Sequence, residues 1–190
     1  MARKTERLIL RPLRGWRSRE AASFFAQIDD QYKLLFADLE GITPSELSWQ
    51  PRAGANTIGM LLAHMAIVEV FWLMIASESY ERAKLERVLG IGEDDDGMPI
   101  PESGRAPAGL RGRSLVWYHA LIRKAHAYGK RTARRWTDRD LERVLTRTRR
   151  NGQRTQQNLR WILYHVLEHQ AGHYGQILLL RHLHRDRRGG

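Results

Sequence analysis

The sequence predicts an all-α protein, a four-helix bundle built around one hydrophobic core. Apolar residues recur at three- and four-residue steps along most of the chain, which is the period of an amphipathic helix. Serine, threonine and asparagine residues precede these periodic segments, where their side chains can cap the first turn of a helix. A length of 190 residues, 42% of them hydrophobic, is enough to bury such a core.

The first long helix is predicted over residues 18–40 and is followed by a short turn. Gly41 is placed to end this helix, since glycine adopts the left-handed conformation found after a helix C-terminus. Thr43-Pro44-Ser45-Glu46 has the pattern of a capping box with proline at the first helical position, which predicts a helical turn. The apolar positions of the long helix are Phe24, Ile28, Tyr32, Leu35 and Leu39.

The second long helix is predicted to run from an N-cap at Asn56 to about Glu86. Its first two-thirds are apolar nearly all round, and such a helix belongs in the core. Residues 90–112 follow and are rich in proline and glycine, which predicts a long surface loop. The acidic run Glu93–Asp96 lies within this loop.

A third long helix is predicted over residues 114–136, with Ser114 as its cap. Residues 137–140 repeat the capping pattern and predict another short helical turn. Between residues 143 and 155 the side chains alternate around Asn151-Gly152, a dipeptide common in tight hairpins, which favours a short two-stranded excursion.

The last helix is predicted over residues 156–184, followed by a basic tail at 185–190. We find no internal repeat and no composition shift that marks a boundary between domains. The sequence therefore predicts a single domain over residues 1–190, with its core at about 18–184 and basic segments at both ends.

The formal net charge of +11 is unevenly distributed. Residues 1–20 carry +5, residues 21–110 carry −8 and residues 111–190 carry +14. Such a field attracts polyanions, so nucleic acid is a candidate partner. The arginines are scattered among aliphatic residues without a known nucleic-acid motif, and a solvated basic surface explains them better. We expect nucleic-acid binding to be weak and non-specific if it occurs at all.

The chain contains no cysteine, which excludes disulfides, thiolate metal sites and cysteine nucleophiles. Any thiol chemistry must therefore use an external thiol. The N-terminal segment has only a three-residue apolar run and predicts no signal peptide, so we expect a cytoplasmic protein. Residues 58–76 are the one candidate membrane span, but His64 and Glu69 lie inside it, which favours a buried helix and no membrane partner.

Two apolar stripes place three histidines toward the core. His169 and His173 interrupt a stripe on the last helix, and His64 interrupts one on the second helix. Side chains four residues apart are separated by about 40° and about 6 Å along a helix, so His169 and His173 can bind one ion. The apolar members of the two stripes are Leu159, Ile162, Val166, Ile177 and Leu180, and Met60, Ile67, Phe71 and Met74.

A single inward histidine is better explained as a core residue with one hydrogen-bonded partner. Three together would leave unsatisfied or mutually repelling ring nitrogens, whereas a metal ion uses their lone pairs. The sequence therefore predicts a site for one divalent transition metal at His64, His169 and His173. Such a ligand set favours zinc or nickel, with iron and copper as further candidates. Glu69 or backbone carbonyls are candidate acceptors for the remaining ring nitrogens.

The other histidines are assigned weaker roles. His165 stands four residues before His169 but lies to the side of the stripe, so we place it on the flank of the site. His119 and His126 are predicted to be surface or interface residues. His182 and His184 lie in the basic last turn, where contact with the helix dipole explains them.

Three segments resemble the DinB-like family of metal-binding four-helix bundles, which includes thiol-dependent transferases and isomerases of bacteria. The segments are Leu47–Pro51, Asn56–Gly59 leading to His64 and Glu69, and His165–Ile177. The resemblance extends from the first helix to about Leu183. Position by position, it places the metal triad of the family on His64, His169 and His173. Some relatives carry a glutamate where His169 stands, so the resemblance leaves the metal and the reaction open.

The resemblance further implies a homodimer and, for some members, a thiol cosubstrate such as mycothiol or bacillithiol. The leading hypothesis is therefore a metalloenzyme that transfers a low-molecular-weight thiol to small electrophiles. One alternative is a metal-dependent hydrolase acting through bound water. Another is a non-enzymatic stress-response module with a structural metal and weak nucleic-acid binding. Three protein ligands favour an enzyme, because structural zinc sites are closed by four.

Overall fold

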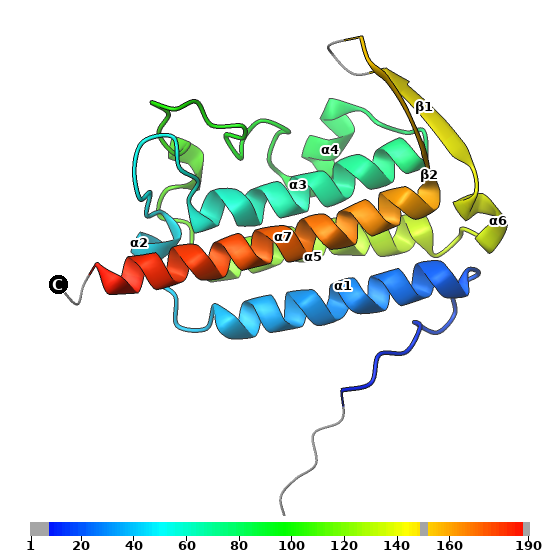
Figure 1. The fold of residues 1–190 in the computed structure, drawn as a ribbon, viewed down its shortest axis with the longest axis horizontal. Helices are drawn as coiled ribbons and strands as arrows, with labels where there is room; N and C mark the ends of the chain where they lie inside the picture. The colour runs from blue at the N-terminus through cyan, green and yellow to red at the C-terminus, as the bar shows by residue number, and fades with distance from the viewer. Residues whose placement is uncertain (1–7, 149–151, 188–190) are drawn as a thin grey trace, which may run out of the picture.

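The computed structural model of the protein describes residues 8–148 and 152–187. Most of this part of the chain is helical, and a small two-stranded sheet accompanies the helices. Its four long helices are α1 (Arg19–Asp38), α3 (Ile58–Ala76), α5 (Leu115–Ala133) and α7 (Leu159–Asp186), and they lie side by side along the long axis of the molecule (Figure 1). The prediction of a mostly helical protein is confirmed.

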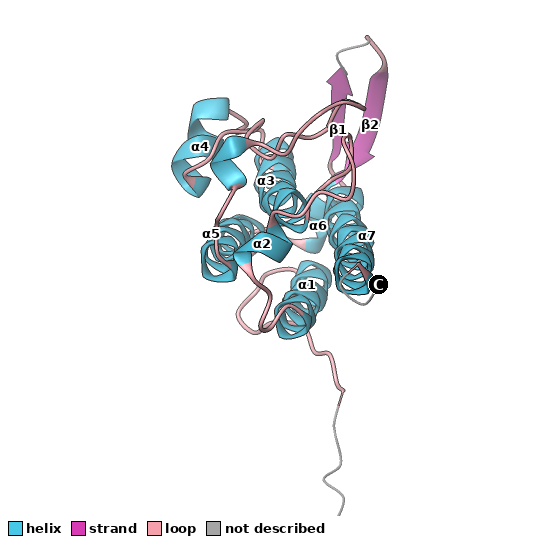
Figure 2. Ribbon diagram, turned by 90° about the vertical axis from the view of Figure 1, so that its left-hand side faces the viewer, coloured by secondary structure: helices cyan, strands magenta, loops and turns pink. Residues whose placement is uncertain are grey.

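Helix α3 lies against both α5 and α7, and α1 closes the opposite side by packing against α7 and α5 (Figure 2). Most residues of α3 are buried, including Met60, Leu62 and Leu73 at 0% exposure. This burial explains why α3 lacks a polar face. Within the described residues, α3 is the one helix long and apolar enough to cross a membrane, and 72% of its most apolar window is buried inside the protein. That is the position of a core helix.

Each long helix begins at a side-chain cap. Ser18 Oγ accepts a hydrogen bond from the Ala21 N–H at 2.9 Å, and Ser114 caps α5 in the same way. The cap of α3 is Thr57, one residue after the predicted Asn56. Helix α7 begins at Leu159 behind the cap Asn158, so the predicted start at residue 156 is wrong. The reason is that residues up to 158 pair in a strand.

The two predicted capping boxes each begin a short helix, but only one of the boxes is complete. In α6 (Asp138–Leu141) the box is complete, because Thr137 and Asp140 each accept from the backbone N–H of the other. In α2 (Pro44–Leu47) only Thr43 caps, accepting from the Glu46 N–H at 3.1 Å. The carboxylate of Glu46 instead pairs with the guanidinium of Arg181.

The predicted second helix does not continue to residue 86. Helix α3 ends at Ala76, and a separate α4 (Arg82–Leu89) follows. Glu78 adopts a left-handed φ of 52°, which turns the chain, and Ser77 Oγ donates to the Leu73 carbonyl at 2.7 Å. Polar residues whose side chains compete for backbone groups favour such helix ends.

The loop after α4 packs on the long helices, with Asp96 and Leu110 buried, and contains a single 3₁₀ turn at Ala108–Leu110. Gln50 holds it by donating to the Gly104 carbonyl at 3.0 Å. The predicted hairpin is present: β1 (Val144–Thr148) pairs antiparallel with β2 (Arg154–Asn158), so it extends three residues beyond the predicted end. Of the predicted turn dipeptide, Gly152 has a left-handed φ of 81°, while Asn151 lies outside the described residues.

Candidate metal centre

Three histidines from two helices converge beside the core. His64 projects from the middle of α3, and α7 supplies His169 and His173 from one face, one turn apart. The His169 Nε2 atom lies 3.1 Å from His64 Nε2 and 3.0 Å from His173 Nε2. One ring nitrogen from each residue lies within 4.8 Å of those of the other two. The structure thus brings together the three residues that the stripes single out.

Neighbouring acceptors orient two of these rings. His64 Nδ1 lies 2.8 Å from an Asp96 carboxylate oxygen, and His173 Nδ1 lies 2.9 Å from Gln176 Oε1. Both acceptors favour a proton on Nδ1, so in the neutral ring Nε2 carries the lone pair. The lone pairs of His64 and His173 therefore point at the same place, next to His169.

The third ring, that of His169, is held neutral. Burial, together with the neighbouring imidazoles of His173, His64 and His165, lowers the pKa of His169 to about 3. Burial and the adjacent His64 also lower the pKa of His173, against an opposing hydrogen bond with Gln176. Neutral imidazoles are the form that binds a metal ion.

This donor set fits a divalent transition metal. Hydrogen bonds among the rings cannot satisfy three nitrogens when at least two of them offer only lone pairs. His169 Nδ1 is also buried without a hydrogen-bond partner among the described residues. A cluster with these properties could hold one ion, with His64, His169 and His173 as its ligands.

The acidic loop contributes Asp96 to the site, which the sequence reasoning missed. Asp96 is 2% exposed, and its second oxygen accepts from the Met98 N–H at 2.9 Å. The candidate acceptor Glu69 is wrong for this role. Its carboxylate lies elsewhere in the core, where it accepts from Tyr32 at 2.7 Å and contacts His126 at 2.8 Å.

His165 lies on the flank of the cluster, as expected from the stripe. Its ring stacks on Trp161 with the centroids 4.9 Å apart and the planes 7° apart. Its Nδ1 atom contacts the exposed Glu168 at 3.0 Å. The ring centroid is 5.8 Å from that of His169, so His165 borders the cluster without belonging to it.

Two of the remaining histidines are buried, and for His126 this contradicts the predicted surface or interface position. His126 lies between Glu69 and Asp29, 2.8 Å from a carboxylate oxygen of each. His184 is 1% exposed and packs edge-on against Trp49. The partners of His126 and His184 come from distant parts of the chain, so local sequence patterns do not indicate that these histidines are buried. His119 is exposed, as predicted, and His182 is exposed as well.

A pocket of about 880 Å³ opens beside the histidines. His64 and Asp96 line it together with the aromatic side chains of Phe71, Trp72 and Trp161. The hairpin forms part of its wall, since Arg147 of β1 lies over the Phe71 ring at 4.8 Å. The arrangement places a three-nitrogen ligand set next to a space for a small organic molecule.

One family model matches most of the chain. The family model described as mycothiol-S-transferase matches residues 23–186, which include all three clustered histidines and Asp96. No curated protein matches the chain closely enough to count as a relative. Since the match covers most of the sequence, the chain belongs to the mycothiol-S-transferase family, a DinB-like family.

Proposed function

We propose that this protein is a metal-dependent enzyme that transfers a low-molecular-weight thiol of the mycothiol type to small electrophiles. The observation that carries the proposal is the convergence of the His64, His169 and His173 ring nitrogens beside an aromatic-lined pocket. Membership of the mycothiol-S-transferase family supports the thiol as cosubstrate. Bacillithiol is a second thiol of the same class.

The proposed ligands are three imidazoles, which favour zinc or nickel and also accept iron(II) or copper. When bound, such an ion would lower the pKa of a thiol and so raise the fraction of reactive thiolate. The chain has no cysteine, so the thiol must come from the cosubstrate. Fewer than four protein ligands in the cluster leave room for that thiol.

The protein's own residues would orient the reactants and exclude water. Asp96 fixes the ring of His64, and Gln176 fixes that of His173, so the lone pairs need no reorganisation. The faces of Phe71, Trp72 and Trp161 offer apolar area for the body of the substrate. The carboxylates of Glu93, Asp94 and Glu168 also line the pocket and can accept hydrogen bonds from hydroxyl or amide groups.

The decisive assay measures the loss of free thiol in the presence of model electrophiles. Mycothiol, bacillithiol, glutathione and cysteine are each tested with metal-loaded protein, metal-free protein and the His169→Ala variant. We expect metal-loaded protein to be faster than both controls, with mycothiol preferred. If no thiol gave such an advantage and the electrophile was hydrolysed instead, the protein would be a hydrolase. If neither reaction was accelerated, the proposal of an enzyme would be abandoned.

We also propose that the four long helices form a DinB-like four-helix bundle in a single domain over residues 1–190, and that two copies associate as a homodimer. Helix α7 supports a dimer because it exposes Tyr164, Leu179 and Leu183 at 50%, 58% and 44%. Exposed large apolar side chains of this kind are candidate contact residues. Analytical ultracentrifugation tests it: the parent should sediment as a dimer, and Leu179→Lys should shift it toward the monomer. A parent that remains monomeric would contradict the proposal.

A further inference from the structure

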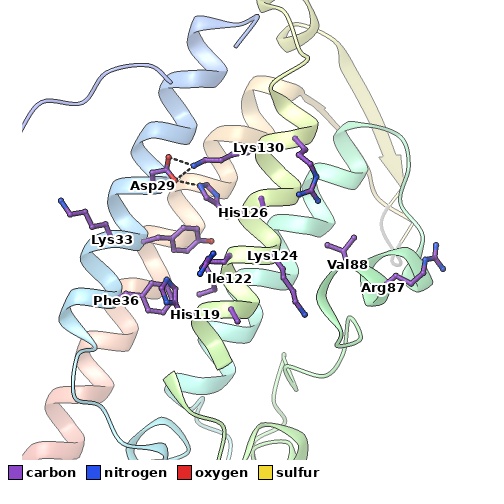
Figure 3. A pocket seen from close by; sticks show the side chains of 15 residues that line it. Asp29, Lys33, Phe36, Arg87, Val88, His119, Ile122, Lys124, His126 and Lys130 are labelled. Carbon is purple, nitrogen blue, oxygen red and sulfur yellow. Dashed lines mark hydrogen bonds and ion pairs between the residues drawn. The ribbon is translucent and has the colours of Figure 1, made fainter. Parts of the chain in front are cut away.

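A second pocket, of about 1200 Å³, lies between α1, α4 and α5 (Figure 3). It shares no lining residue with the pocket beside the histidines. We propose that this second pocket binds a small organic anion, an apolar chain or ring that carries a phosphate, sulfonate or carboxylate group. The proposal is independent of the reaction at the histidines.

The floor of the second pocket is apolar and comes from three helices. Phe36 of α1, Val88 of α4 and Ile122 of α5 line it (Figure 3). Ile122 is 1% exposed, while Phe36 and Val88 are half-buried. The ring of Phe36 is further supported by His119, with the centroids 4.2 Å apart. Burying a hydrocarbon group on such a floor is favourable in proportion to its area.

Cationic side chains surround this floor. They are Lys33, Arg87, Arg123, Lys124, Lys130 and Arg131. Arg87 and Lys130 have carboxylate partners in Glu81 and Asp29. For the other four, no carboxylate lies within 4.0 Å among residues 8–148 and 152–187. Lys124 Nζ also donates to the Leu89 carbonyl at 3.2 Å and has further N–H groups, so all four charges can serve a ligand.

The one acidic residue of the second pocket, Asp29, is already neutralised. Its carboxylate accepts from Lys130 Nζ at 2.5 and 2.6 Å and lies 2.8 Å from His126 Nε2 (Figure 3). His126 is in turn held by the buried Glu69, which Tyr32 also contacts. The carboxylates of Asp29 and Glu69 are thus balanced by Lys130 and His126 in the wall of the second pocket. The unbalanced charge of the second pocket is positive.

This combination fits a small amphiphilic anion better than a nucleic acid. A phosphate backbone needs cations along an extended track and would leave the apolar floor unused. An organic anion uses both features, because its charged group meets the cations while its hydrocarbon part covers Val88 and Ile122. Because the second pocket is concave, it favours a ligand that inserts into it over one that lies across the protein surface.

Calorimetric titration of the metal-loaded protein with hexyl phosphate at low ionic strength tests the proposal. Butyl phosphate, inorganic phosphate and hexanol are the comparison probes. We expect hexyl phosphate to bind at least about tenfold more tightly than inorganic phosphate or hexanol, since each buried methylene contributes up to about fourfold in affinity. The affinity for butyl phosphate should lie between the affinities for hexyl phosphate and for inorganic phosphate. Equal affinity for hexyl and inorganic phosphate, or no binding of either, would overturn the proposal.

Two double variants separate the second pocket from the general positive field. Lys33→Gln with Arg123→Gln removes two pocket cations and should weaken hexyl phosphate binding by about tenfold. Arg52→Gln with Arg185→Gln removes the same charge at exposed positions outside the pocket and should change binding by less than about twofold. His169→Ala should bind as the parent does. Equal losses in the two double variants, or loss in His169→Ala, would place the ligand elsewhere and refute the assignment.

Discussion

The carboxylate of Asp96 accepts a hydrogen bond from Nδ1 of His64 at 2.8 Å, although the two residues stand 32 positions apart. The contact links the acidic loop after α4 to the middle of α3. It leaves the Nε2 lone pair of His64 directed toward His169. The loop is therefore part of the candidate metal centre.

Removing this carboxylate should weaken metal binding without removing a ligand. We expect Asp96→Ala to lower the metal affinity by about 10- to 100-fold, because ring orientation and basicity depend on the acceptor behind the ligand. Competition with a chromophoric chelator measures the change. Asp94→Asn is the matched control, since this neighbouring carboxylate pairs with Arg82 at the surface. Equal affinities of the parent and Asp96→Ala would show that the contact does not tune the site.

The buried ion network predicts a pH dependence of stability at alkaline pH. Burial alone would lower the pKa of His126, but the charge of Glu69 and the hydrogen bonds with Asp29 and Glu69 raise it to about 9. Between the unfolded value of 6.5 and about 9, the folded protein binds more protons than the unfolded chain. The stabilisation is thus complete below pH 6.5 and is lost as the pH rises toward 9.

Urea unfolding of the parent and of His126→Gln measures this contribution. The free energy of unfolding of the parent should fall by up to about 3 kcal/mol more than that of the variant over the same interval. The variant should also be less stable at neutral pH, since Glu69 and Asp29 lose a shared cation. Parallel pH profiles for the two proteins would contradict a charged His126.

Gly59 in the first turn of α3 should not tolerate a side chain. A Cβ there would overlap the hydroxyl of Tyr118, which is 1% exposed and donates to the Leu110 carbonyl. We expect Gly59→Ala to lower the free energy of unfolding by about 1–3 kcal/mol. Gly172→Ala is the control, because open space surrounds this glycine in α7 and alanine favours a helix. Thermal unfolding should show a loss of stability for Gly59→Ala only. Equal stabilities of Gly59→Ala and the parent would refute the packing argument.

The positive charge should give weak binding to nucleic acid. We expect association with DNA or RNA to be independent of sequence and to weaken steeply with added salt, because it depends on counterion release. Fluorescence anisotropy with two unrelated duplexes over a range of salt concentrations measures it. Tight binding to one duplex at physiological salt would favour the non-enzymatic alternative.

Most of the long helices and three residues of the candidate site could be predicted from local periodicity. The stripes on α3 and α7 placed His64, His169 and His173 inward, and the structure brings the three rings together. The end of α3 at Ala76 was missed because apolar residues recur later in the segment, at Tyr80, Leu85 and Leu89. The period of a helix constrains which face a residue occupies, and the end of the helix depends on competing polar contacts.

The residues that the sequence reasoning missed are those whose partners lie far away along the chain. Asp96 stands in a run of four acidic residues, and no local signal separates it from its exposed neighbour Asp94. His126 is buried because it meets Asp29 and Glu69, which lie 97 and 57 residues away. Ion pairs between residues far apart in the chain do not follow the helical period, so a single sequence does not indicate them.

The metal content of protein purified without a histidine tag tests the central claim most directly. We predict about one transition-metal ion per chain by elemental mass spectrometry, as three imidazole ligands on one ion require. His64→Ala, His169→Ala and His173→Ala should each lose most of it, whereas His165→Ala should retain it. A variant lacking all three clustered histidines that kept the metal content of the parent would contradict the proposed metal centre.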